Sequence, residues 1–484
     1  MIHTKKTNSN LVLKSIFYLY ILSFPLELLP VFLPIKTFFG PSAAISNSML
    51  VCALGLVFSL VTIGPKTKIP SYITHTTLGV ILLCASSFLM SAFLTPALGV
   101  LWGETPFDCI IPRCIFQILI PIVLLYNFYC FQLVSKKELI NLFFAYSTLM
   151  LITGYVQFAM ILGLPLSGLY DSLNIFEILK DSKTIISMER IPSLTDEPSY
   201  LASDLGTLIF PFLCACNLSN IKKKLSWIHL VLYLPIVYWS KSSTLIVVVL
   251  SNVLMWIYLK MMKNESKGSG VNKPLIFTLA FIFAVVLMFL FYNIPVIRSA
   301  IFKTTDTENL STAYRYSTVV NDILVFLKYP LLGCGNGIQG FFYNENCPDW
   351  AYFSYETQAS LSGANGVLNG GAFVPATISG YGILGIILVS LFIHQGFKLI
   401  RNKREEIGFL YHMYVIGIVA FLVNGIAAVS IDGSFHEMFI LSLPLCTYSE
   451  KITETKTTVD NNSSLRNKKY LKPSGRFGNL KRSI

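Results

Sequence analysis

Apolar runs of about 20 residues recur along almost the whole chain, and they decide what it can fold into. A helix needs about 20 apolar residues to cross the hydrocarbon core of a bilayer. The predicted runs are roughly 11–32, 43–63, 75–95, 114–133, 139–163, 198–218, 225–239, 243–259, 274–293, 376–397, 407–430 and 436–449. The sequence therefore predicts an all-α, polytopic transmembrane helical bundle of about 12 spans.

The composition excludes the other classes that a chain of 484 residues could belong to. Hydrophobic residues make up 54% and charged residues 13%, whereas a soluble globular chain carries roughly 25% charged residues. Such a chain lacks the charge to cover a soluble surface, and it is too apolar to be disordered. The net charge of +12 would suggest nucleic acid in a soluble protein, but here membrane topology explains much of it and no nucleic acid is expected.

Lysine and arginine mark one side of the predicted bundle. They gather in short segments at 222–224, 260–273 and 398–404, whereas the much longer segments on the other side contain fewer. Basic loops stay in the cytoplasm, so both termini are predicted to be cytoplasmic. Two of these segments flank the short runs 225–239 and 243–259, which must then be two crossings joined by a turn at 240–242. The first run is long, contains Pro25 and Pro30 and lacks a cleavage site, which favours an uncleaved helix over a signal peptide.

This topology divides the chain into a membrane domain, 1–449, and a basic tail, 450–484. The tail carries nine Lys and Arg residues and is predicted to be cytoplasmic and disordered, with contact to anionic lipid as an alternative. Two long loops lie outside, at about 164–197 and 294–375. The second loop is too long for a simple connector. It contains an amphipathic stretch at 317–327, typical of a helix on a membrane surface, and a glycine-rich turn at 333–337.

Charged residues next to the predicted spans gather on the outside. In the segment Thr195-Asp196-Glu197-Pro198-Ser199-Tyr200, a plain helix N-terminus would explain the proline and the acids. In a helix, however, Glu197, Tyr200, Leu201 and Asp204 would share one face, and two carboxylates on such a face indicate a cavity rather than lipid.

Four basic side chains are the other candidates at this side of the membrane. Arg190 is near enough in sequence to fold back onto Glu197, although a surface salt bridge would explain that pairing. Arg315 precedes the amphipathic stretch and could instead be an interfacial arginine. Arg113 lies at the outer end of the fourth predicted span, and Lys241 lies in the turn at 240–242.

Four segments together resemble the O-antigen polymerase and O-antigen ligase superfamily of membrane proteins. They are RIPSLTDEPSYLA (190–202), SKSSTLIVVVL (240–250), AYRYSTVVNDILVFLKYPLLGCGNG (313–337) and GANGVLNGGAFVPATISGYGILGIIL (363–388), in the order in which the family has them. The sequence departs from ligase-type relatives at two places. Ala364 precedes Asn365 where those relatives carry a functional histidine, and Tyr329 begins the Pro-Leu-x-Gly turn where a histidine is frequent.

The resemblance implies an enzyme, a membrane glycosyltransferase that polymerises undecaprenyl-diphosphate-linked oligosaccharide units into O-antigen or capsular polysaccharide. The reaction would take place at the outer face of a bacterial inner membrane. Arg190 and Arg315 would bind the leaving diphosphate, helped by Lys241 and Arg113. Glu197 would be either the base or the group that orients Arg190, with Tyr200 and Asp204 beside the substrate. A chain-length regulator and a flippase in the same membrane would be partners.

Two other functions remain as alternatives at this stage. One is a ligase of the same superfamily, which the missing loop histidine disfavours. The other is a flippase for the same lipid-linked unit, which should have short outside loops rather than long ones. The sequence contains no phosphate-binding P-loop, HExxH or CxxC motif, so neither a cofactor nor a metal is predicted. Aromatic residues at 350–355 are interpreted as sugar-stacking groups or as interfacial anchors.

Overall fold

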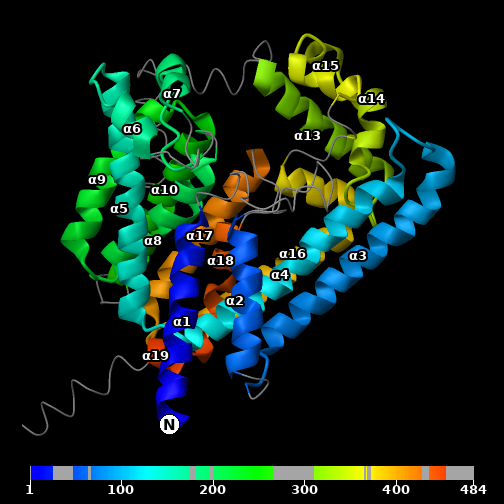
Figure 1. Ribbon diagram of the computed structural model, residues 1–484. Coiled ribbons are helices and arrows are strands. Elements are labelled where there is room, and N and C mark those ends of the chain that lie inside the picture. The colour runs from blue at the N-terminus through cyan, green and yellow to red at the C-terminus, as the bar shows by residue number, and fades with distance from the viewer. Residues whose placement is uncertain are drawn as a thin grey trace, which may run out of the picture.

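The protein is described here by a computed structural model (Figure 1). It describes residues 2–24, 47–63, 67–173, 181–195, 198, 200–265, 310–364, 367, 372–427 and 435–453. These residues form helices and turns without a strand, apart from one isolated bridge between Leu101 and Glu104. The all-α prediction is confirmed for this part of the chain.

Six of the described helices are long and apolar enough to cross a membrane. They are α3 (Ser71–Leu98), α4 (Pro106–Leu133), α5 (Lys136–Ile161), α10 (Ser243–Glu265), α16 (Phe373–Asn402) and α17 (Gly408–Ala427). Other helices accompany them: α1 (Ile2–Leu22), α2 (Asn47–Ile63), α8 (Phe210–Leu218) and α9 (Lys223–Ser240). A multi-pass membrane protein is therefore supported, although a count of about 12 spans is not.

The last predicted span, 436–449, is helical and has two parts. The chain forms the eight-residue helix α18 (Phe435–Ser442) and then a 3₁₀ segment, η6 (Leu443–Tyr448). Both are buried among α4, α17 and α16. The predicted span 274–293 and the tail from 454 lie outside the described residues.

Local sequence signals explain where the long helices begin. Thr105 and Asp108 form a reciprocal capping box at the start of α4, and Ser135 and Glu138 form another at the start of α5. Each box satisfies backbone N–H groups that the first turn would leave without partners. Glu138 also accepts a hydrogen bond from Lys14 at 2.7 Å, which ties α1 to α5.

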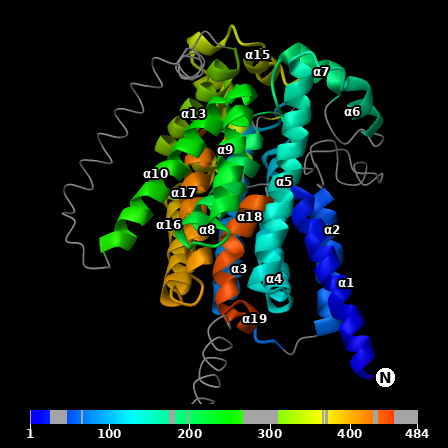
Figure 2. The same ribbon diagram turned by 90° about the vertical axis from the view of Figure 1, so that its left-hand side faces the viewer.

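The two predicted outside loops emerge at the same end of the bundle. One contains α6 (Ser167–Leu173) and α7 (Ser182–Met188), and the other contains α13 (Leu310–Lys328), α14 (Tyr343–Asn346) and α15 (Tyr355–Leu361). The start of α1 and the last helix, α19 (Glu450–Thr453), lie at the opposite end (Figures 1 and 2). This arrangement is the one that the distribution of basic residues requires.

The sixth predicted span is a π-helix at its start. Residues Ala202–Ile209 form the π segment η3, which continues into α8. The amide of Phe210 donates to the carbonyl of Leu205, five residues earlier, and this wider turn rotates side chains away from their α-helical positions. The amide of Asp204 donates to the carbonyl of Tyr200 at 3.3 Å, and of these two residues Tyr200 is 40% exposed and Asp204 is 3% exposed.

Helix α16 is broken near its outer end, at Gly382, whose φ is +60°. The turn 330–335 fills the break. The amides of Cys334 and Gly335 donate to the carbonyls of Ser379 and Gly380, and the amides of Ile383 and Leu384 donate to the carbonyls of Pro330 and Leu331. A break inside an apolar helix is tolerated because these bonds replace those that the helix loses.

The amphipathic stretch predicted at 317–327 is confirmed as part of a helix, α13, and its polar side is the buried one. Ser317, Asn321 and Asp322 are buried, whereas Ile323, Leu324 and Leu327 are exposed. The polar side packs on α16, α14 and α15, so the apolar side is free to face lipid.

Candidate functional site

Arg190 and Lys241 meet where the first outside loop touches the end of α9. We call residues 189–191 and 239–241 the loop–α9 junction. Arg190 Nε donates to the Ser240 carbonyl at 3.1 Å, and the Ile191 amide donates to the Trp239 carbonyl. Lys241 Nζ lies 3.2 Å from a carboxylate oxygen of Glu189. Arg190 Nη2 also donates to the Lys241 carbonyl at 3.5 Å. These contacts bring two basic residues about 50 positions apart in the sequence to one junction.

The backbone of the junction adopts a conformation that side chains usually avoid. Glu189 has a φ of 48° and Lys241 a φ of 50°. In the left-handed region a residue other than glycine pays roughly 1–2 kcal/mol, and such residues cluster at functional sites. Glycine is the favoured residue at a left-handed helix C-terminus such as position 241. A lysine at this position therefore indicates that its side chain has a function.

The electrostatics of the junction suit an anion. Arg190 is half-buried, Lys241 is exposed, and the exposed Glu189 forms an ion pair with Lys241. Arg190 Nε and Nη2 donate to the carbonyls of Ser240 and Lys241, which fixes the orientation of the guanidinium. Guanidinium groups bind phosphate oxygens with paired hydrogen bonds.

The structure does not bring every predicted site residue to this junction. Arg315 is exposed on α13, which packs on α16, α14 and α15 rather than on the first loop. In both views α13 and α7 stand apart at the same end of the bundle (Figures 1 and 2). Arg113 is half-buried on α4 next to Gly337. Tyr200 is exposed at the entrance to η3, and Glu197 lies outside the described residues.

Asp204 belongs to a different environment, a polar cluster inside the bundle. It accepts a hydrogen bond from Tyr146 at 2.7 Å, and His436 Nδ1 lies 4.0 Å from it. Asn424 connects Ser203, at 2.8 Å, to Glu437, at 3.4 Å. The cluster unites α5, η3, α17 and α18, so the predicted substrate-binding role of Asp204 finds no support in its surroundings.

Sequence reasoning missed Tyr146, Asn424, His436 and Glu437. A histidine and a carboxylate inside an apolar run were the signal that could have found the cluster, because a charged group buried at membrane depth needs a partner. Within the described ranges, no group of three or more His, Cys, Asp or Glu side chains is arranged to hold a metal ion.

A second buried carboxylate, that of Asp322, lies where the turn 330–335 meets α16, a contact we call the turn–α16 junction. Asp322 accepts a hydrogen bond from Ser379 Oγ at 2.9 Å, and its other oxygen has no hydrogen-bond partner among the described residues. Burial raises the pKa of Asp322 to about 7. The same Ser379 supplies the carbonyl that accepts from Cys334, so this carboxyl group stabilises the broken helix.

The four segments that carry the family resemblance meet in two pairs. Segments 190–202 and 240–250 form the loop–α9 junction, and segments 313–337 and 363–388 form the turn–α16 junction. No protein-family model matches the chain, and a search of curated proteins finds no relative.

Proposed function

We propose that this protein is a membrane glycan polymerase that acts on polyprenyl-diphosphate-linked oligosaccharide units. The observation that carries the proposal is the loop–α9 junction, where Arg190 and Lys241 meet at the end of the bundle that holds both long loops. The resemblance of the sequence segments that build this junction to the O-antigen polymerase and ligase superfamily supports the same assignment.

In the proposed reaction, a hydroxyl group of one glycan attacks the anomeric carbon of the other. A new carbon–oxygen bond forms, the bond from the anomeric carbon to the diphosphate breaks, and the hydroxyl proton passes to a base. Arg190 and Lys241 stabilise the negative charge that develops on the diphosphate. Arg315, exposed on α13 at the same end, is the second arginine of the proposal. Glu197 is the base or orients Arg190, and Tyr200 flanks the entrance.

Deleting the protein in its native host and analysing the surface glycan on a gel tests the proposal. Loss of a polymerase leaves glycan with a single repeat unit. Loss of a flippase leaves no glycan on the surface, and loss of a ligase leaves long polymer on the carrier lipid. Either of the last two results would overturn the polymerase assignment.

Single variants test the site. Arg190→Ala and Arg315→Ala should each give the deletion pattern at normal protein levels. Arg404→Ala is the matched control, because Arg404 lies at the α16–α17 turn and stacks on Tyr411 at 4.8 Å. A normal glycan ladder from Arg190→Ala would remove the junction from the proposed site.

A further inference from the structure

Arg190 lies between two residues whose backbone is left-handed. Glu189, directly before it, has a φ of 48°, and Ser193, three positions after it, has a φ of 58°. Residues other than glycine keep such a conformation only where their surroundings hold them in it. The contacts of the loop–α9 junction surround Glu189 and Arg190, whereas Ser193 is held from a different helix, α5.

Gln157 of α5 binds both backbone groups of Ser193. The Ser193 amide donates to Gln157 Oε1 at 2.7 Å, and Gln157 Nε2 donates to the Ser193 carbonyl at 2.8 Å. Gln157 Nε2 also donates to the hydroxyl oxygen of Tyr170, on α6, at 2.9 Å. Ser193 Oγ donates to the Met150 carbonyl, again on α5, at 2.7 Å. Because Gln157, Ser193 and Tyr170 are all buried, these bonds are shielded from water.

The chemistry of a primary amide explains why a glutamine occupies position 157. The group carries an acceptor and two donors in one plane, so it can pair with the N–H and the C=O of one residue at the same time. An ionised carboxylate has no donor, and an apolar side chain has neither group. A buried amide costs free energy unless its hydrogen bonds are made, and the Gln157 amide makes three. We expect its use to be the backbone that it holds.

We propose that Gln157 is a positioning residue for Arg190. The segment 190–195 is fixed from two helices, because the end of α9 binds Arg190 and Ile191 while α5 binds Ser193. Gln157 is fully buried, so it acts through this backbone and sets where the guanidinium group meets the leaving diphosphate. Its role rests on the proposed function for the reaction. Donors that stabilise a developing charge must be held in place, and a displacement of about 1 Å can cost up to about a hundredfold in rate.

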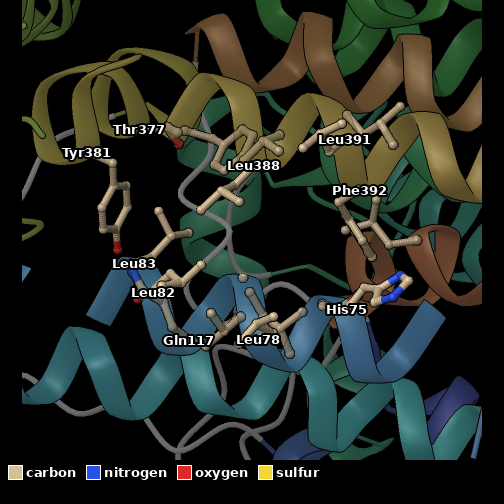
Figure 3. Close-up of a pocket in the computed structure, with 18 of the residues that line it drawn as sticks. His75, Leu78, Leu82, Leu83, Gln117, Thr377, Tyr381, Leu388, Leu391 and Phe392 are labelled. Carbon is tan, nitrogen blue, oxygen red and sulfur yellow. The ribbon is translucent and has the colours of Figure 1, made fainter. Parts of the chain in front are cut away.

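Gln157→Met tests this role, because methionine keeps the length of the side chain and removes all three hydrogen bonds. Gln157→Glu is a second variant in case the first does not fold, since it keeps the acceptor and loses the donors when ionised. Gln117→Met is the matched control. Gln117 is also a buried glutamine of a long helix, α4, but it accepts from Cys84 Sγ at 3.3 Å and lines a cavity between α3 and α16 (Figure 3).

The first measurement is hydrogen exchange of the full-length protein, which reports the loop without any substrate. The peptide that contains residues 190–195 should exchange about tenfold faster or more in Gln157→Met than in the wild type. The helices should exchange as in the wild type, and Gln117→Met should match the wild type in both regions. Unchanged exchange of this peptide in both Gln157 variants would overturn the inference.

The second measurement is the rate of polymer formation per folded molecule, with Gln157→Met and Arg190→Ala made singly and together. Gln157→Met alone should be slower by about tenfold or more, and Gln117→Met should equal the wild type. Added to Arg190→Ala, Gln157→Met should cause no further loss, because the group that it positions is gone. Two losses that multiply would show a purely structural role and overturn the inference, as would an equal loss in Gln117→Met.

The failure of this inference can be told from the failure of the proposed function. Full activity of Gln157→Met despite faster exchange would overturn the positioning role and leave the proposed function standing. If the wild type makes no polymer from lipid-linked units, the proposed function falls and the role of Gln157 in the reaction falls with it. The exchange measurement would then still decide whether Gln157 holds the segment.

Discussion

The loop–α9 junction and the turn–α16 junction both join an outside segment to the end of a helix, but they are built differently. Charged side chains mark the first, with Arg190 bonded to Ser240 and Lys241 paired with Glu189. Four backbone hydrogen bonds hold the second, and Gly333 and Gly382 lie at its closest approach.

This difference distinguishes residues that the packing of the backbone requires from residues that packing does not explain. The glycines of the turn–α16 junction are explained by packing, because a side chain there would collide with backbone. The basic residues of the loop–α9 junction are not explained by packing, since Lys241 sits in a conformation that favours glycine. We therefore expect substitutions at the second junction to destroy the fold and substitutions at the first to destroy activity.

Gly382→Ala should have the largest effect. Its φ of +60° disfavours alanine, and the new methyl group would overlap the carbonyl oxygen of Pro330. Strain combined with lost hydrogen bonds places the expected loss of stability above about 4 kcal/mol, seen as a loss of folded protein in thermal unfolding. Gly79→Ala, which has open space around it, is the control and should be as stable as the wild type or slightly more so. A stable Gly382→Ala protein would mean that the break in α16 is not held by close packing.

Arg190→Ala should reduce polymer formation by about a hundredfold or more while the protein stays folded. Removing one donor that stabilises charge in a transition state typically costs that much. Arg190→Lys should recover only part of the activity, because an ammonium group cannot form the bidentate contact of a guanidinium. The rate of polymer formation per folded molecule is the measurement. If Arg190→Ala instead unfolds the protein, the contrast between the two junctions disappears.

The turn–α16 junction should lose stability as the pH rises. The pKa of Asp322 is about 7 in the folded protein, against about 3.9 for an unfolded chain. The folded state therefore keeps a proton that the unfolded state has released, and the stabilisation present below pH 4 is lost between about pH 4 and 7. We expect a decrease on the order of a few kcal/mol over this window, measured by chemical unfolding of the full-length protein. Asp322→Asn should remove this dependence, and an equally steep pH profile in that variant would assign it to another group.

Lys241→Gly should change the stability less than the variants above. It should raise the stability of the protein and lower its activity. Glycine relieves the left-handed backbone at the end of α9, which should raise the free energy of unfolding by up to about 1 kcal/mol. Polymer formation should fall, because a charge near the diphosphate is lost. Lys241→Ala keeps the strain and serves as the comparison. Equal activity of Lys241→Gly and the wild type would show that the Lys241 side chain has no role in polymer formation.

The sequence alone predicts the helices well, because an apolar run of about 20 residues has few other ways to satisfy its backbone. It also predicts that the two long loops lie together, since basic residues fix the side of each connection. It fails where backbone geometry departs from the α-helix. No residue pattern predicts the π segment at Ala202–Ile209.

The candidate site is predicted in part. Arg190 and Lys241 can be singled out because charges next to a span are costly, but their contact depends on how a loop folds over 50 residues. The buried cluster of Tyr146, Asp204 and His436 combines three distant elements. Long-range packing of this kind leaves no local signal in one sequence.

The most direct test of the account is polymer synthesis by the purified protein in lipid vesicles supplied with undecaprenyl-diphosphate-linked repeat units. The account predicts products of several units and free undecaprenyl diphosphate from the wild type, and only single units from Arg190→Ala. Undiminished polymer from Arg190→Ala, or unchanged single units with the wild type, would contradict it.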